Sequence, residues 1–236
     1  MYARTVGSED LSFGVSGMLW RDNLVMYDRQ TDSWWAQATG MAIHGPKTGA
    51  SLTQLPSDMM EWKRWRATYP DTVVLVDSGG GNRPAQDRYA SYHRGGSIGV
   101  TGRTRGGGAL DAKARILGFR LDGGAFAMSL DAPGQGVVLS TQAAGQALVV
   151  VATPDRTAAR VFLAGGHAFS EDGVEGDRTL MKDRATGSRW DGFDGRALSG
   201  PLAGLRLEPV TAHQSYWFSW YSFFPDTVVL VPARDQ

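Results

Sequence analysis

The chain has 236 residues, and its 24 basic and 24 acidic side chains give a formal net charge of zero. It contains no cysteine, which excludes disulfides, thiolate metal sites and a cysteine nucleophile within it. A neutral chain has no overall field that draws it to nucleic acid, and no apolar run approaches the twenty residues of a membrane-spanning helix, so we expect neither a nucleic-acid partner nor a transmembrane segment.

The first third of the chain predicts a hairpin followed by a helix. Alternating apolar residues predict a strand over Leu24–Asp28 and a return strand over Trp34–Ala38. After Pro56 we predict a short helix capped by Asp58, and then a β-branched strand over Thr72–Val76.

The rest of the chain begins with a connection rich in glycine and arginine, residues 77–109, which predicts a long surface loop. Alternating apolar segments then predict five strands. They are Ile116–Leu121, Ala125–Leu130, Val137–Leu139, Leu148–Ala152 and Ala158–Leu163. A second helix is expected from Thr211, with Gln214 as its capping-box partner, and a closing strand over Thr227–Val231.

An internal repeat is the strongest pattern in the sequence. Residues 26–76 match residues 181–231 without a gap, so that each position recurs 155 residues later. The match is anchored on tryptophan, glycine and proline. It predicts a mainly β fold with short helices, in which two related β-rich repeat units pack into one body. We place the first unit at 1–76, the connection at 77–109 and the second unit at 110–236.

The two copies differ in what precedes them. Several predicted strands precede the second copy within residues 110–157, whereas the matching place in the first copy falls at Tyr2. A unit without these strands would have open sheet edges. We therefore expect the first unit to be N-terminally incomplete, or to receive its missing strands from another chain.

Five segments resemble one known family. They are Phe13–Gly17, Asn23–Thr31, Ala114–Phe119, Tyr216–Trp220 and Phe224–Thr227. Together they resemble the bacterial and archaeal family catalogued as domain of unknown function 3179, in the family's order along nearly the whole chain. The resemblance implies no assigned function. It is compatible with a place outside the cytoplasm, although residues 1–5 lack the apolar stretch of a secretory signal.

The resemblance also bears on the N-terminus. Family members carry a Tyr-Cys-Pro-x-Cys stretch shortly before the Phe13–Gly17 segment, which here would fall upstream of Met1. The second copy has Val151–Asp155 at the equivalent place, with a proline and no cysteine. No role of the family's cysteines can therefore be carried over to a position of this chain.

The candidate ligand-binding residues are Trp34, Asp28 and Arg29. We expect most repeated tryptophans to be core, namely Trp35, Trp62, Trp65, Trp190, Trp217 and Trp220. Trp34 differs because its counterpart is Arg189 and because it points away from the face that Trp35 occupies, so it could stack on a sugar or a base. Asp28 and Arg29 point to opposite faces of a strand, and the alternative is a structural role in the turn.

Other motifs predict no site. The four histidines, His44, His93, His167 and His213, have no metal-site spacing and are expected to be scattered on the surface, so we predict no metal and no cofactor. Ser16 lacks the context of a nucleophile elbow. Gly45–Thr48 predicts a turn rather than a phosphate loop, and the basic stretch Arg103–Arg105 predicts a solvated loop.

Two classes of function remain open. The first is a structural or ligand-binding β-repeat protein. The alternative is a fragment of a redox or metal-dependent protein whose reactive cysteines lie upstream of this chain.

Overall fold

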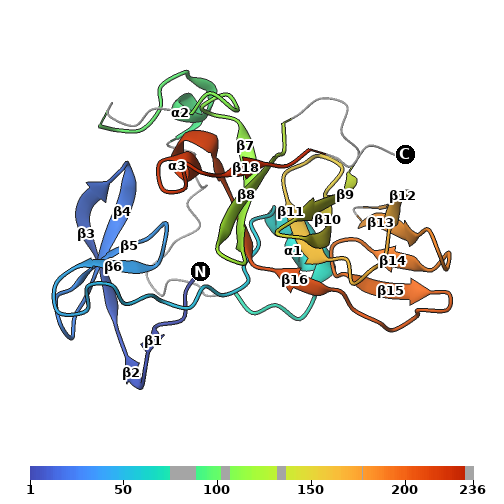
Figure 1. The fold of residues 1–236 in the computed structure, drawn as a ribbon, viewed down its shortest axis with the longest axis horizontal. Coiled ribbons are helices and arrows are strands. Elements are labelled where there is room, and N and C mark those ends of the chain that lie inside the picture. Colours follow the sequence, from blue (N-terminus) through green and yellow to red (C-terminus); the bar gives the residue numbers. More distant parts are fainter. Residues whose placement is uncertain (75–88, 102–106, 132–136, 177, 232–236) are drawn as a thin grey trace.

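The structure is a computed structural model that describes residues 1–74, 89–101, 107–131, 137–176 and 178–231 (Figure 1). These residues form four four-stranded sheets and a two-stranded ribbon. Three short helices accompany them: α1 (Trp62–Thr68), α2 (Ala90–Arg94) and α3 (Trp217–Tyr221). The predicted mainly β fold with short helices is confirmed, whereas the division into two repeat units stays a prediction.

The first sheet is an antiparallel meander on the left of Figure 1. Its strands are β3 (Phe13–Trp20), β4 (Asn23–Asp28), β5 (Trp34–Ala36) and β6 (Met41–His44). The ribbon of β1 (Thr5–Val6) and β2 (Glu9–Asp10) precedes it. A small core lies against one face of this sheet. It consists of Leu11, Trp35, Ala42 and Leu52, with Phe13 and Met26 packed around them.

The second half of the chain stacks three sheets. The central sheet has the order β16 (Glu208–Val210), β11 (Ala159–Leu163), β10 (Gln146–Ala152) and β9 (Val138–Ala143). A second sheet has the order β17 (Ala212–Tyr216), β7 (Arg115–Leu121), β8 (Gly124–Ser129) and β18 (Val228–Val229). The third has the order β12 (Phe169–Glu175), β13 (Arg178–Asp183), β14 (Arg189–Asp191) and β15 (Arg196–Ser199).

Alternation along β10 explains the stacking. Val150 joins the cluster that contains Phe119 and Met128 of the β7–β8 hairpin, whereas Val149 packs with Met181 and Trp190 of the third sheet. Successive side chains of a strand point to opposite faces, so β10 is buried on both sides. This burial is the reason that the apolar segments after residue 110 form the predicted strands.

The helix predictions need correction. The predicted second helix exists as α3, but its start at Thr211 is wrong, because residues 212–216 form β17, whose pairing with the buried strand β7 overrides the local capping signal. Asp58 does not cap α1; Glu61 holds the N-cap position without a side-chain hydrogen bond. Helix α2 lies in the connection for which only a loop was predicted. Of the strand predicted over Thr72–Val76, the part up to residue 74 is not a strand, and the remainder lies outside the described residues.

The tryptophan predictions hold for four of the six residues expected in the core. Trp35, Trp190, Trp217 and Trp220 are buried. Trp65 is half-buried, and the prediction is wrong for Trp62, of which 49% is exposed. Trp217, which matches Trp62 in the repeat, instead packs with Ile116 and Ala127 of the β7–β8 hairpin.

Several hydrogen bonds recur at the repeat spacing of 155 residues. Turn bonds from a threonine amide to an aspartate, bonds from a loop amide to a serine hydroxyl, and tryptophan-to-threonine bonds each occur twice. The pairs are Thr31–Asp28 with Thr186–Asp183, Lys47–Ser33 with Leu202–Ser188, and Trp65–Thr72 with Trp220–Thr227. Matching sequence therefore makes matching local contacts.

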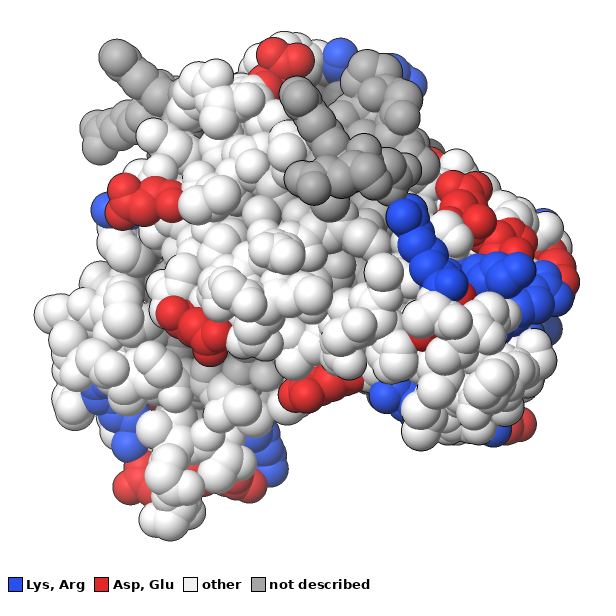
Figure 2. Space-filling view, turned by 45° about the vertical axis from the view of Figure 1, so that its right-hand side comes forward, with Lys and Arg blue, Asp and Glu red and all other residues white. Residues whose placement is uncertain are grey.

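The surface mixes charges of both signs. Figure 2 shows positive and negative side chains side by side at the right, while most of the central face is uncharged. Arg189, for example, pairs with both Asp172 and Glu175. Among the described residues, no helix has the length and apolar character needed to cross a membrane.

Asp28 generates the first testable prediction. Burial alone would raise the pKa of its carboxyl, but hydrogen bonds from the Trp35 indole and the Thr31 amide and hydroxyl outweigh burial and lower the pKa. The stability that this carboxylate contributes is therefore complete above about pH 4 and is lost as pH falls through the lower folded-state pKa. We expect Asp28→Asn to lower the free energy of unfolding at pH 7 by about 1–3 kcal/mol.

Denaturant unfolding at pH 7 and at acid pH measures this effect. Asp32→Asn, at an exposed position of the same turn, is the matched control and should unfold like the parent chain. An Asp28→Asn chain as stable as the parent at pH 7 would show that the turn does not depend on the carboxylate.

Candidate functional site

A cleft of about 280 Å³ lies where the first sheet meets β17 and α3. On the side of the first sheet its wall includes Asn23, Gln37 and Gln54. On the opposite side it includes His213 of β17 and Ser219 of α3. Residues nearly two hundred positions apart thus converge on one cavity.

Local packing positions His213. The pairing of β17 with β7 places His213 opposite Gly118. A side chain at Gly118 would collide with Trp220, because a Cβ there would lie 2.5 Å from the indole ring. Trp220 is itself fixed by a 2.7 Å hydrogen bond from its Nε1 to Thr227 Oγ1. The imidazole of His213, 5.1 Å from the indole centroid, therefore rests against a rigid aromatic wall.

His213 is uncharged at neutral pH. Burial, with a smaller contribution from the positive amino group of Met1, lowers the pKa of its imidazole to about 4. A neutral imidazole has one N–H donor and one nitrogen acceptor. Within the described part of the chain, no residue forms a hydrogen bond with either ring nitrogen. Both functions of the ring are therefore available to a ligand.

Other polar side chains in the wall of the cleft also lack hydrogen-bond partners. In the described structure the side chains of Gln37, Gln54 and Ser219 form no hydrogen bond, and the buried Oδ1 of Asn23 has no partner. The lining contains no acidic, lysine or arginine side chain. The cleft is thus rich in hydrogen-bonding groups and free of side-chain charge.

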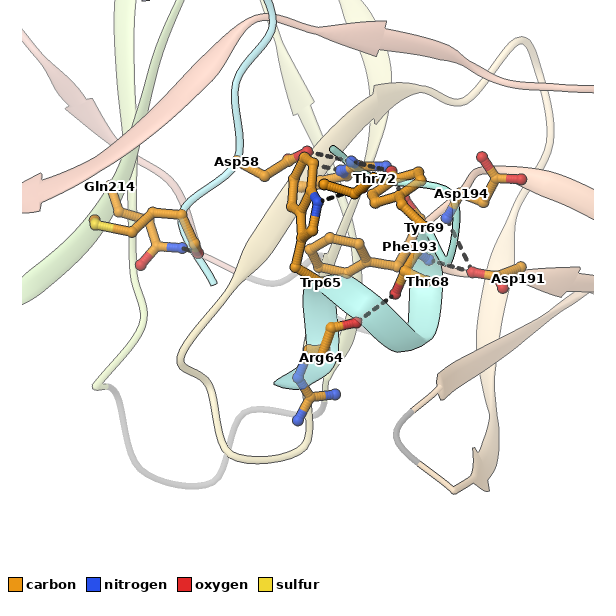
Figure 3. Close-up of polar contacts among 12 residues, drawn as sticks. Asp58, Arg64, Trp65, Thr68, Tyr69, Thr72, Asp191, Phe193, Asp194 and Gln214 are labelled. Carbon is orange, nitrogen blue, oxygen red and sulfur yellow. Dashed lines mark hydrogen bonds and ion pairs between the residues drawn. The ribbon is translucent and has the colours of Figure 1, made fainter. Parts of the chain in front are cut away.

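A second polar centre lies where the segment around α1 meets β11 (Figure 3). Arg160 donates from Nε to Asp58 Oδ1 over 2.7 Å, and its Nη2 bonds the other oxygen of the same carboxylate. It also donates to Tyr69 Oη over 2.7 Å and to the carbonyl of Phe193, whose ring centroid lies 4.6 Å from the guanidinium carbon.

This second centre is charge-balanced, and a smaller pocket of about 150 Å³ lies beside Asp58 and Arg160. The side chains of Arg160 and Asp58 are each 18% exposed. Burial alone would lower the pKa of Arg160, but the hydrogen bonds and charge of Asp58 raise it above its usual value. The centre joins the first part of the chain to the second, and its guanidinium is already engaged.

The residues predicted from sequence lie elsewhere. Trp34 is 38% exposed, as expected, and stands opposite Tyr27 with its ring 4.9 Å from that of His44. The guanidinium of Arg29 lies 5.6 Å from the Tyr27 ring. Asp28 is fully buried, and its carboxylate is taken up by the turn. None of the three predicted residues lines the cleft.

The remaining sequence candidates have structural contacts. Ser16 donates its hydroxyl to the Val25 carbonyl, and His167 pairs with Asp183. Among the described residues, no cluster of three or more His, Asp or Glu side chains could hold a metal ion. Arg103–Arg105 lies outside the described residues. The expectation that all four histidines are scattered on the surface is wrong for His213, which lines the cleft.

Sequence reasoning missed the cleft because its polar residues are separated along the chain and share no motif. One signal was present in the repeat. His213 stands 155 positions after Asp58, and Phe224 stands 155 positions after Tyr69. The side-chain type therefore changes at these two matched positions, whereas the tryptophans near them recur in both copies. Such changes within a repeat mark places where the two copies differ in role.

The fold and the cleft define a mainly β protein with a polar site, free of side-chain charge, between two parts of its chain. The chain belongs to the family described as Protein of unknown function (DUF3179), whose model matches residues 1–227. This match confirms the resemblance carried by the five segments. No curated protein and no solved structure matches the chain.

The lowered pKa of His213 predicts a pH dependence. Because the unfolded imidazole binds a proton near pH 6.5 and the folded one near pH 4, stability should fall as pH decreases from about 6.5 to about 4, by on the order of 3 kcal/mol. His213→Gln, which stays neutral, should flatten this part of the curve.

Thermal unfolding across this pH range, with His44→Gln as the surface control, measures the effect. An NMR titration that placed the pKa of His213 near 6.5 would contradict the buried neutral imidazole.

Proposed function

We propose that this protein binds a small uncharged polar molecule in the cleft beside His213. The observation that carries the proposal is the neutral imidazole, held against Trp220 and without a hydrogen-bond partner among the described residues. A concave site with an aromatic wall and a few convergent polar groups is typical of small-molecule binding.

Energetics support a ligand that offers both donors and acceptors. A buried polar group left without a hydrogen bond costs about 1–3 kcal/mol. In the cleft, Asn23 Oδ1 is such a group among the described residues, and the half-buried His213 ring also lacks a hydrogen-bond partner there. A ligand that satisfies more than one of them replaces cleft water with fixed hydrogen bonds. Burying a cation there would be unfavourable, because no lining side chain is acidic and the amino group of Met1 is itself positive.

A second candidate surface is centred on Trp34. Its exposed ring stands where the other copy has Arg189, which is engaged in ion pairs with Asp172 and Glu175. Trp34 and Arg29, on either side of Tyr27, would offer a stacking face on the outside of the first sheet, with Asp28 holding the turn below. The alternative of a redox or metal-dependent protein places its reactive cysteines upstream of this chain, and no residue described here supports or excludes it.

Filling the cleft tests the main proposal. We expect Ser219→Trp to occupy the cavity and to abolish the binding of neutral polar fragments, because Ser219 lies in its wall. A panel of polyols, monosaccharides and primary amides would be screened by saturation-transfer difference NMR against both chains. Circular dichroism would establish that the variant keeps its β structure.

Ser51→Trp, at an exposed position outside the cleft, is the matched control and should keep the binding of the parent. Fragments that bind equally to the parent and to Ser219→Trp would place binding elsewhere, and a variant at Trp34 would then be the next to examine.

A further inference from the structure

We infer that the first sheet carries a second binding site, separate from the cleft, and that its ligand is a carboxylated oligosaccharide. Two successive sugar rings stack on Tyr27 and Trp34, and a carboxylate of the sugar pairs with Arg29. None of these three residues lines the cleft, so the site goes beyond the function proposed above.

One row of side chains crosses all four strands of the first sheet. The register places Gly14 of β3 opposite Tyr27 of β4. It places Trp34 of β5 opposite Tyr27 on one side and opposite His44 of β6 on the other. Partners across strands share a face of the sheet, and Trp35, the next residue of β5, lies in the core on the other face. Tyr27, Trp34 and His44 therefore form an aromatic row on the outer face.

The rings of the aromatic row lie apart from one another across the sheet. A Cβ added to Gly14 would lie 2.5 Å from Cζ of Tyr27, so the end of the Tyr27 ring occupies the place of a side chain on β3. Trp34 instead contacts His44, with the ring centroids 4.9 Å apart. Tyr27 and Trp34 thus offer two stacking surfaces on different strands, which a ligand of two linked rings can use together.

The third sheet is an internal control for this row. Its matching row consists of polar and charged side chains: Ser170, Lys182, Arg189 and Ser199. Lys182 and Arg189 match Tyr27 and Trp34 in the repeat. The matching sheet forms without aromatic rings in this row, so packing does not require them. Exposed aromatic side chains that packing does not require indicate a binding surface.

The polar edges of the row suit a sugar. Trp34 and His44 are exposed, and within the described part of the chain the Trp34 indole N–H, the Tyr27 hydroxyl and the His44 ring nitrogens form no hydrogen bond. The C–H groups on one face of a pyranose are attracted by the negative face of an aromatic ring. The hydroxyls at the rim of the sugar bond groups such as these edges. A sugar ring therefore matches both properties of the row.

The charge beside the row favours a carboxylated sugar. The guanidinium carbon of Arg29 lies 5.6 Å from the centroid of the Tyr27 ring. One of its N–H groups donates to the Phe13 carbonyl, and no carboxylate among the described residues pairs with it. The neighbouring Asp28 is buried and accepts a bond from Trp35. The remaining donors of Arg29 are suited to the two oxygens of a ligand carboxylate.

A single-stranded nucleic acid also stacks on aromatic rings. It carries a phosphate at every step, however, and depends on several cations for its affinity. Lys47, three residues after His44, is paired with Glu9, which leaves Arg29 as the cation in contact with the row. One cation beside two stacking rings matches a chain with one carboxylate for every one or two sugars better than a chain of phosphates.

Isothermal titration calorimetry with three acidic oligosaccharides tests the inference, namely tetragalacturonate, tetramannuronate and a hyaluronan tetrasaccharide. At least one should bind the parent chain, and Trp34→Ala should weaken it at least about tenfold, because one stacked ring is lost. Trp62→Ala, which removes an exposed tryptophan of α1, is the matched control and should bind like the parent. Equal binding to the parent and to Trp34→Ala, or no binding of any of the three, would overturn the inference.

The methyl ester of the tightest oligosaccharide tests the role of the charge. The parent chain should bind the acid at least about tenfold more tightly than the ester, whereas Arg29→Gln should bind both alike. Arg66→Gln, at an exposed position of α1, should keep the preference of the parent. A parent chain that binds the ester as tightly as the acid would contradict the carboxylate.

Further variants separate this site from the cleft. Ser219→Trp, which fills the cleft, should bind the acidic oligosaccharide like the parent. If Ser219→Trp abolishes this binding and Trp34→Ala does not, the sugar binds in the cleft and the inference is wrong. If the cleft binds no neutral fragment while the row binds the sugar, the proposed function is wrong and the inference stands. Oligothymidylate that binds more tightly than the sugars and loses affinity in Trp34→Ala would replace the sugar by a nucleic acid.

A variant outside the ring positions covers a failure of Trp34→Ala to fold. Gly14→Ser introduces the residue that Ser170 supplies in the matching row, and its Cβ displaces the flexible Tyr27 ring. It should weaken the oligosaccharide while circular dichroism shows the β structure of the parent. Unchanged affinity in Gly14→Ser would contradict stacking on Tyr27.

Discussion

The ion pair between Asp58 and Arg160 is the interaction on which the arrangement of this protein depends. It is largely buried, and both oxygens of the carboxylate bond the guanidinium. A buried charge without its partner is strongly destabilising, so the segment that carries Asp58 is held on β11 of the second half. Because that segment is held on β11, the chain after the first sheet runs across to the second half before α1 begins. The first sheet then lies against β17 and α3, where the cleft is found.

One scaffold thus presents two chemically different centres. Matched turns, serine-to-amide bonds and tryptophan-to-threonine bonds keep the local geometry of the two copies alike. Against this shared geometry the two matched positions differ: Asp58 pairs with Arg160, whereas His213 lines the cleft without a hydrogen-bond partner among the described residues. The outer faces of the sheets differ in the same manner, since Trp34 is exposed where Arg189 forms ion pairs.

Strands and turns could be predicted because their signals are local. Apolar alternation located β10 and β11, and the Asp28 turn was evident from residue types that favour turns. Contacts between distant segments could not be predicted. The capping signal at Thr211 was overridden by the pairing of β17 with β7. Asp58 was assigned to a helix cap because its partner Arg160 is over a hundred residues away and cannot be recognised from the sequence around Asp58. The cleft escaped prediction for the same reason, although the change from Asp58 to His213 within the repeat was visible.

A double-mutant cycle on Asp58 and Arg160 tests the central claim most directly. The free energy of unfolding would be measured for the parent, Asp58→Ala, Arg160→Ala and the double variant. If the segment around α1 is docked on β11 by this pair, each single change should be strongly destabilising and the two should be coupled by about 1–3 kcal/mol. Effects that add to within about 0.5 kcal/mol would show that the two residues do not interact, and the docking of the α1 segment on β11 by this pair would then be contradicted.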